Sequence, residues 1–140
     1  MDANFLADGT EYEREGFDWT DSWIHEPQLE WLASDLKAAA GRPVIVLTHQ
    51  TLEDETTPHG VKNARVIRSM LEAAGNVVCV IEGHNHAGVC VDVNGILYFA
   101  PKAMRDCVGA QDNAYAVVSL GPGRGLTIEG FGSQEGLRRS

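Results

Sequence analysis

Three histidines stand at the ends of two apolar runs, and their type and spacing suggest metal chemistry. His49 closes the run PVIVLTH (43–49), while His84 and His86 follow the run VVCVIEG (77–83). Neutral imidazole is a good ligand for zinc and other first-row divalent ions, and three such nitrogens with one open position describe a catalytic metal site. If the second pair lies in an extended segment, residues two apart point the same way, so both are expected to face one locus.

The segments around these histidines predict the unit that would bring them together. Runs 43–49 and 77–83 are continuous and rich in β-branched residues, which is typical of fully buried strands. A helix is predicted between them, from about Val61 to Ala74, because its apolar residues recur with a period of 3.6 and Gly75 ends it. Two strands joined in this way run parallel and end at the same edge of their sheet.

The rest of the chain predicts one more helix and an antiparallel carboxyl half. Residues 27–41 begin with proline, carry leucines on one stripe and end with glycine, as a surface helix does. Alternating segments flank the turn signals Asn94-Gly95 and GPGRG, and these predict hairpins: 89–94 with 96–101, and 114–120 with 126–131. We therefore expect an α/β fold in a single domain over residues 1–140. Its mixed sheet has a βαβ unit followed by antiparallel strands, with helices on one face.

The composition argues against a nucleic-acid-binding, membrane-spanning or secreted protein. The formal net charge is −9 and the basic residues are scattered, which argues against a nucleic-acid surface. No run of about 18 apolar residues could cross a membrane, and the opening MDANFLADG lacks the features of a signal peptide, which favours the cytoplasm. Cys79, Cys90 and Cys107 have no close-pair spacing, so we expect reduced core residues.

Three segments resemble the carboxyl-terminal half of the calcineurin-like metallophosphoesterases, near the purple acid phosphatase and cyclic-nucleotide phosphodiesterase types. They are QLEWLASDL, VIVLTHQ and, about thirty residues on, VIEGHNH, and the resemblance runs from MDANF through YFAPKAM. It implies an αββα-type fold of which this chain supplies about half. It also implies that His49 and His84 ligate one divalent transition metal (zinc, manganese or iron) and that His86 ligates a second.

The same resemblance implies an incomplete metal site. The family's amino-terminal half supplies the motifs Asp-x-His, Gly-Asp-x-x-Asp and Gly-Asn-His-Asp/Glu, and none of these occurs here. A standard two-metal site therefore cannot be built from one copy of this chain. The apolar face that the other half would cover predicts a homo-oligomer, with a dimer favoured.

These observations lead to the hypothesis of a metal-dependent phosphoester hydrolase, in which hydroxide held by the metal attacks phosphorus. Small phosphodiesters or phosphotriesters are favoured, because a monoester dianion profits most from two metals and basic clamps. His59 and Asn85 are candidate substrate contacts; the open alternatives are a solvated loop histidine and a residue that only holds its turn. Residues 8–26 are expected to form an ordered loop that packs over the helices or walls the substrate.

The alternative hypothesis is a catalytically inactive half-domain that folds as an oligomer or needs a partner chain supplying the missing metal ligands. An enzyme should lose turnover on chelation and in His84→Ala, whereas a remnant should show no metal-dependent turnover.

Overall fold

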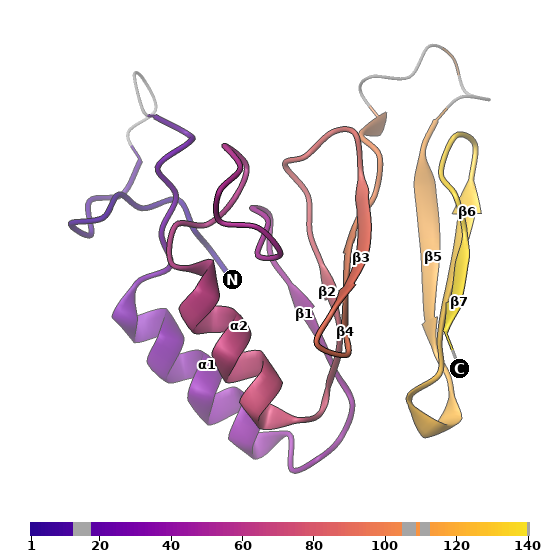
Figure 1. Ribbon diagram of the computed structural model, residues 1–140, viewed down its shortest axis with the longest axis horizontal. Helices are drawn as coiled ribbons and strands as arrows, with labels where there is room; N and C mark the ends of the chain where they lie inside the picture. Colours follow the sequence, from indigo (N-terminus) through magenta and orange to yellow (C-terminus); the bar gives the residue numbers. More distant parts are fainter. Residues whose placement is uncertain (13–17, 105–108, 110–112, 140) are drawn as a thin grey trace.

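The computed structural model describes residues 1–12, 18–104, 109 and 113–139 of the chain. Figure 1 shows three layers, in which two helices cover one face of a four-stranded sheet and a three-stranded sheet covers the other. The helices are α1 (Glu26–Ala38) and α2 (Ala64–Ala74). The predicted α/β class, with helices on one face of a mixed sheet, is confirmed.

The four-stranded sheet has the order β1-β2-β4-β3, with β1 at Val44–Leu47 and β2 at Val77–Ile81. Strands β1 and β2 pair in parallel, as the βαβ prediction requires, and β4 (Ile96–Ala100) is also parallel to β2. Strand β3 (Val89–Val93) is antiparallel to β4. The carboxyl ends of β1 and β2 therefore share one edge of the sheet, where the predicted histidines begin.

The second sheet is antiparallel throughout, with the order β5-β6-β7. Its strands are β5 (Tyr115–Leu120), β6 (Leu126–Phe131) and β7 (Leu137–Arg139), and the 3-10 turn η2 (Pro122–Arg124) links the first two. The predicted hairpin around GPGRG is confirmed, whereas β7 was not predicted from the sequence.

Strand β4 shows how one element holds three layers together. Ile96 and Tyr98 pack towards the helices, in the core that includes Ile67 and Leu71 of α2. Leu97 and Phe99 pack towards the second sheet, against a core that includes Leu126 and Ile128. Because successive side chains of a strand point to opposite faces, both faces of β4 are buried and its sequence is apolar throughout.

Two glycine signals work as predicted. Gly75 ends α2 in the left-handed conformation, with φ of 67°, and the turn between β3 and β4 places Asn94 and Gly95 at φ of 52° and 87°. Helix α2 begins three residues later than predicted, at Ala64. The preceding Asn63 is engaged elsewhere, since its side chain donates to Ile24 O at 2.7 Å and accepts from Ile24 N at 3.1 Å.

Two burial predictions are wrong. Strand β1 is not fully buried, because it is an edge strand, and Leu47 near the site is 63% exposed. Cys79 is a buried free thiol as expected, but Cys90 is exposed on β3 and is not a core residue. Cys107 lies outside the described residues.

Among the helices in the described part of the chain, none is long and apolar enough to span a membrane.

Candidate metal centre

The predicted site residues gather around the carboxyl ends of β1 and β2. Thr48, just past β1, donates its backbone N–H to Ile81 O at 3.1 Å, and Gly83 N donates to His49 O at 2.8 Å. These two bonds extend the pairing of β1 and β2 beyond the strands themselves. His49 is therefore tied to the backbone that immediately precedes His84.

Gly83 makes this close approach possible. A Cβ at position 83 would lie 3.0 Å from His49 Nδ1 and 3.4 Å from His49 O. Such contacts are tighter than ordinary packing allows, so a larger residue would displace the His49 ring. Gly83 therefore leaves the space that the imidazole of His49 occupies.

The segment after Gly83 is a turn and not the extended stretch predicted from the sequence. His84 has φ of 64°, which is uncommon for a residue other than glycine, and Asn85 N donates to Gly83 O at 2.7 Å. The prediction that His84 and His86 face one locus through strand alternation therefore rested on the wrong geometry. Strained backbone of this kind persists only where its surroundings hold it, which is common at functional sites.

His84 stands at the centre of a cluster of rings. The centroids of His49 and His59 each lie 5.2 Å from that of His84, and the ring of Trp19 meets His84 edge-on at 5.1 Å. Trp19 also stacks on His59 at 5.6 Å, with 26° between the planes. Besides the predicted partner His49, the rings in contact with His84 are thus those of Trp19 and His59, and the sequence suggested His59 only as a substrate contact.

The electrostatics of the cluster favour the neutral form of His84. Burial, and then the neighbouring imidazoles, lower the pKa of His84 below its ordinary value. Among the described atoms, His84 Nε2 and His59 Nδ1 are buried and have no hydrogen-bond partner. A buried polar atom without a partner is costly, and each of these nitrogens is the kind that binds a metal ion or a substrate oxygen.

Asn85 and His86 follow His84 in the same turn. The side chain of His86 is exposed, and its carbonyl accepts from Ala103 N at 3.0 Å. Asn85 Oδ1 accepts the N–H of Ala87 at 3.2 Å and so helps to hold the turn. This is the structural role that the sequence left open for Asn85, and its place at the cavity leaves substrate contact as a prediction.

All five predicted site residues line one cavity of about 740 Å³. They share it with residues from the amino-terminal loop and the segment after β1: Asn4, Tyr12, Trp19 and Gln50. Sequence reasoning proposed a wall from residues 8–26 only in general terms, and it missed Asn4 and Gln50, which bond to each other at 3.0 Å. His25, from the same region, does not line the cavity; its Nε2 bonds to Leu6 O at 2.8 Å.

A second hollow of about 680 Å³ opens on the other side of the histidine turn, between it and β5. It is lined by the same His49, His84 and His86 and by the mainly apolar side chains of β5 and the segment before it. The histidines therefore stand between two spaces. Among the described residues that line either space, none carries a carboxylate.

The donor set fits a metal ion in part. In the described portion of the chain, no group of three or more His, Cys, Asp or Glu side chains is arranged to hold a metal. The unpartnered nitrogens and the neutral state of His84 nevertheless suit the imidazole share of a metal centre. The oxygen ligands of such a centre would have to come from outside the described residues.

The fold of this chain is similar to that of a known phosphatase. One solved structure that the chain resembles is a dimetal phosphatase from Danio rerio, with a TM-score of 0.73 and 24% sequence identity. The match covers 84% of this chain but only 38% of that protein's chain. No model of a known protein family matches the sequence, and no curated protein matches it. The structural likeness therefore establishes the fold, and this chain corresponds to well under half of its neighbour.

Proposed function

We propose that the chain forms part of a metal-dependent phosphoester hydrolase. The observation that carries the proposal is the convergence of four imidazoles on one cavity, with the buried Nε2 of His84 unpartnered, on a metallophosphoesterase-like fold. His49 and His84 would hold one divalent ion and His86 a second. Such ions polarise a phosphoryl oxygen and lower the pKa of water, which is the chemistry that hydrolysis of a phosphoester needs.

The side chains of the cavity suggest how a substrate is held. His59 lines it with a buried, unpartnered Nδ1, and Asn85 lines it as well; we propose both as contacts to the phosphoryl oxygens. Trp19 and Tyr12 would shield the reacting centre from bulk water. No Lys or Arg is found among the described residues that line this cavity. A small phosphodiester or phosphotriester, which carries less charge than a monoester dianion, is therefore the favoured substrate.

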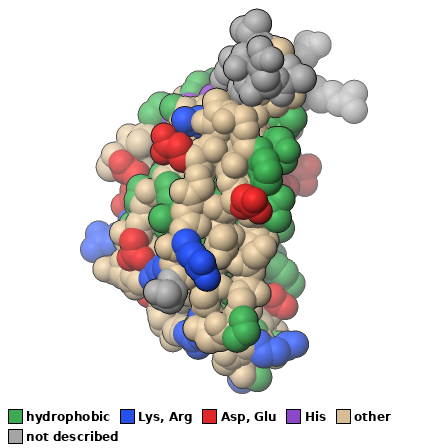
Figure 2. All heavy atoms as spheres, turned by 90° about the vertical axis from the view of Figure 1, so that its right-hand side faces the viewer, with side chains coloured by type: hydrophobic (Ala, Val, Ile, Leu, Met, Phe, Trp, Pro, Cys, Tyr) green, Lys and Arg blue, Asp and Glu red, His purple; other side chains and the backbone are tan. Residues whose placement is uncertain are grey.

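The missing oxygen ligands are proposed to come from a second polypeptide, with a homodimer favoured. Among the described residues, the outer strand β5 pairs with β6 alone; it contains no charged residue, and its Tyr115 and Val117 are 49% and 48% exposed. Figure 2 views the molecule from the side of this sheet, and hydrophobic side chains run along one border of that face. An uncharged open edge of this kind readily pairs with another strand.

Strand β5 also lines the hollow beside the histidines, so a strand added to its edge would run next to the proposed metal centre. Light scattering tests the dimer, and Val117→Lys should dissociate it. Val66→Lys is the matched control, because Val66 on α2 is similarly exposed, at 52%. A monomeric parent chain would refute the dimer and turn the search towards a different partner chain.

The experiment for the enzymatic proposal combines metal analysis with turnover. Purified protein supplied with zinc, manganese or iron is assayed on bis(p-nitrophenyl) phosphate and on p-nitrophenyl phosphate, a diester and a monoester. We expect chelator-sensitive turnover, faster on the diester, that is lost in His84→Asn. His25→Asn is the matched control, because His25 bonds to Leu6 and does not line the cavity.

The second candidate is an inactive half-domain, and the lack of any carboxylate among the described cavity-lining residues favours it. Absence of metal and turnover in every oligomeric state would establish this alternative. We also propose a cytoplasmic location, in keeping with the free thiols of Cys79 and Cys90; cell fractionation tests it.

A further inference from the structure

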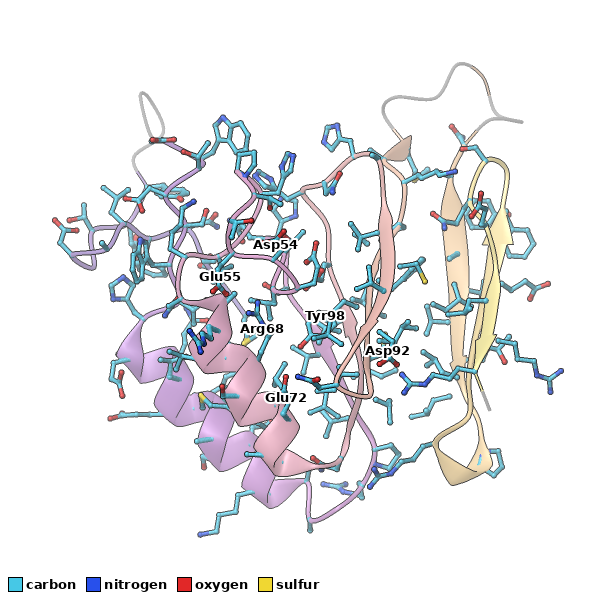
Figure 3. The ribbon with its side chains drawn as sticks, in the orientation of Figure 1. Asp54, Glu55, Arg68, Glu72, Asp92 and Tyr98 are labelled. Carbon is cyan, nitrogen blue, oxygen red and sulfur yellow. The ribbon has the colours of Figure 1, made fainter. Side chains whose placement is uncertain are left out.

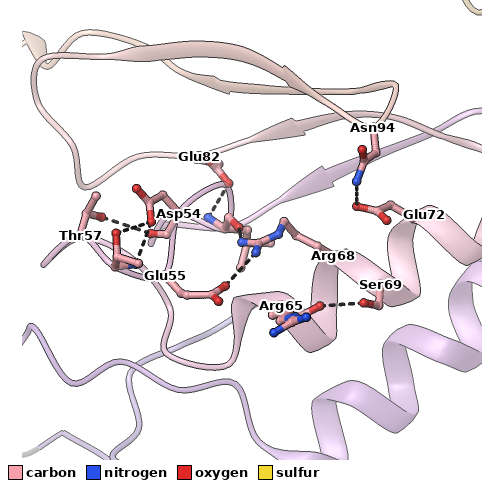
Figure 4. Close-up of polar contacts among 11 residues, drawn as sticks. Asp54, Glu55, Thr57, Arg65, Arg68, Ser69, Glu72, Glu82 and Asn94 are labelled. Atoms are coloured by element: carbon pink, nitrogen blue, oxygen red, sulfur yellow. Dashed lines mark hydrogen bonds and ion pairs between the residues drawn. The ribbon is translucent and has the colours of Figure 1, made fainter.

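Two ionisable side chains, Glu82 and Arg68, form a network of hydrogen bonds that holds the loop between His49 and His59. This loop runs from His49 to His59, and Leu52 within it is fully buried. The backbone N–H of Leu52 donates to Glu82 Oε1 at 2.7 Å, and its carbonyl accepts from Arg68 Nη1 at 2.6 Å. The backbone N–H and C=O of Leu52 are thus both held by side chains from other parts of the chain, as Figure 4 shows for Glu82 and Arg68.

The network reaches His59 through the residue before Leu52. Thr51 N donates to His59 O at 3.1 Å, and Val61 N donates to Thr51 O at 2.9 Å. Fixing Leu52 therefore fixes Thr51, and Thr51 fixes the backbone of His59. On the other side, Glu82 directly precedes Gly83, whose N–H binds the carbonyl of His49. Glu82 is therefore connected to all three histidines of the ring cluster: to His59 through Leu52 and Thr51, and to His49 and His84 through Gly83.

Arg68 completes the network from the helix layer. It lies in α2 and forms an ion pair with Glu55 at 2.8 Å, with side-chain exposures of 18% and 30%. Figure 3 shows Arg68 and Glu55 above α2, near the loop, with Tyr98 on the side of the sheet. The guanidinium spans two points of the loop, at Leu52 and Glu55, and its planar fork suits such a double contact.

Burying Glu82 is costly, which argues that its contact is specific. Glu82 is 4% exposed, so its carboxyl group is almost entirely removed from water. An apolar residue would continue the strand at no such cost, since the preceding residues of β2 are apolar. The position carries an acceptor where a buried backbone N–H needs one.

We propose that Glu82 and Arg68 are positioning residues that clamp the loop at Leu52 and thereby hold His49 and His59 against His84. Neither residue lines the cavity, so neither is a catalytic residue. The effect of the clamp on turnover rests on the proposed function, whereas its effect on the loop does not. The two can therefore be tested separately.

The test uses two disruptive variants, one conservative variant and two matched controls. Glu82→Met and Arg68→Met remove the contacts to Leu52, while Glu82→Gln keeps an acceptor oxygen at the same place. Arg65→Met is the control for the arginine, because Arg65 is an exposed residue of the same helix. Glu72→Gln is the control for the carboxyl, because its hydrogen bond to Asn94 lies away from the loop.

The first readout is amide hydrogen exchange, together with the ring resonances of the histidines. In both disruptive variants the amides of Leu52 and Thr51 should exchange on the order of tenfold to hundredfold faster, as loss of a buried charged hydrogen bond implies. The amide of Val80 in β2 should be unchanged, and the ring signals of His59 and His84 should move. Glu82→Gln and both controls should resemble the parent.

The second readout is turnover of the diester by the parent and each variant. Displaced histidines should lower kcat about tenfold or more with KM changed less than about threefold, and Glu82→Gln should restore the parent rate. A merely structural role would lower global stability without changing kcat of the folded protein. Unchanged exchange at Leu52 in Glu82→Met, or unchanged ring signals in both disruptive variants, would overturn the clamp. A parent without turnover would overturn only the proposed function, and exchange would still decide the clamp.

Discussion

Replacing Gly83 by alanine should leave the free energy of unfolding nearly unchanged while disturbing the site. Replacing Gly60 by alanine should lower the free energy of unfolding. Neither glycine requires a positive φ, so each substitution gains about 0.4–1 kcal/mol from a stiffer unfolded chain. At position 83 the new Cβ meets the His49 ring at 3.0 Å. His49 is exposed, so its ring can yield at a cost of about 0.5–1.5 kcal/mol. The two effects nearly cancel.

At position 60 the new Cβ meets backbone instead of a movable ring. It would overlap the carbonyl oxygen of Asp54 and lie 3.0 Å from Glu55 Cα. Relieving this overlap needs a backbone shift in a loop that Arg68 holds at Leu52 and Glu55, and overpacking of this kind costs about 1–3 kcal/mol or more. The gain from the stiffer unfolded chain is the same for both variants, so we expect Gly60→Ala to be less stable than Gly83→Ala by about 1 kcal/mol or more, the backbone cost minus the ring cost.

Urea unfolding followed by circular dichroism measures this difference, provided the slope with denaturant is the same for both variants. If Gly83→Ala costs as much as Gly60→Ala, the His49 ring does not yield and the argument from its exposure fails. Metal titration gives the complementary result. Displacing one imidazole should weaken binding about tenfold to hundredfold in Gly83→Ala despite its near-normal stability.

Two further predictions concern the core and the cysteines. Ile67→Ala should lower the free energy of unfolding by about 2–5 kcal/mol, because Ile67 is fully buried. Val66 on the same helix is exposed, so Val66→Ala should change the free energy of unfolding by less than about 0.5 kcal/mol. Urea unfolding measures both. Burial raises the pKa of Cys79 to about 12, and only thiolates react with disulfide reagents, so in a Cys107→Ser background the exposed Cys90 should be labelled first. Labelling of folded Cys79 should rise about tenfold for each unit of pH from 7 to 9, and equal rates for the two thiols would refute the buried position.

The parts of the fold that local signals control were predictable from the sequence. The apolar run of β2, the period of α2 and the left-handed Gly75 each act over a few residues, and the structure has all three as expected. The exposure of Leu47 was not predictable in this way. It depends on the position of β1, which pairs with β2 alone in the part of the chain that the structure describes, and this position is a property of the whole sheet.

For the candidate site too, local signals predicted one part and the tertiary fold decided the rest. Its location followed from parallel strands that end together, because this rule needs only the two runs and the helix between them. The ring contacts of His59 and Trp19 with His84 did not follow, since both residues reach the cluster through loops of no regular period. Nor could the sequence pair Glu82 with Leu52, thirty residues earlier, because a buried acid at a strand end has no unique partner before the fold is known.

The metal that the chain prefers should report whether its site is complete. Imidazole nitrogens suit zinc, whereas manganese favours sites rich in carboxylate oxygen. The described residues around the cavity offer imidazoles and no carboxylate, so the chain alone should bind zinc in preference to manganese. If association supplies acidic ligands, the preference should move towards manganese as the oligomer forms, and competition titrations on Val117→Lys and on the parent measure that shift. The same preference in both would mean that association adds no carboxylate, which would leave the histidines as the whole of the site.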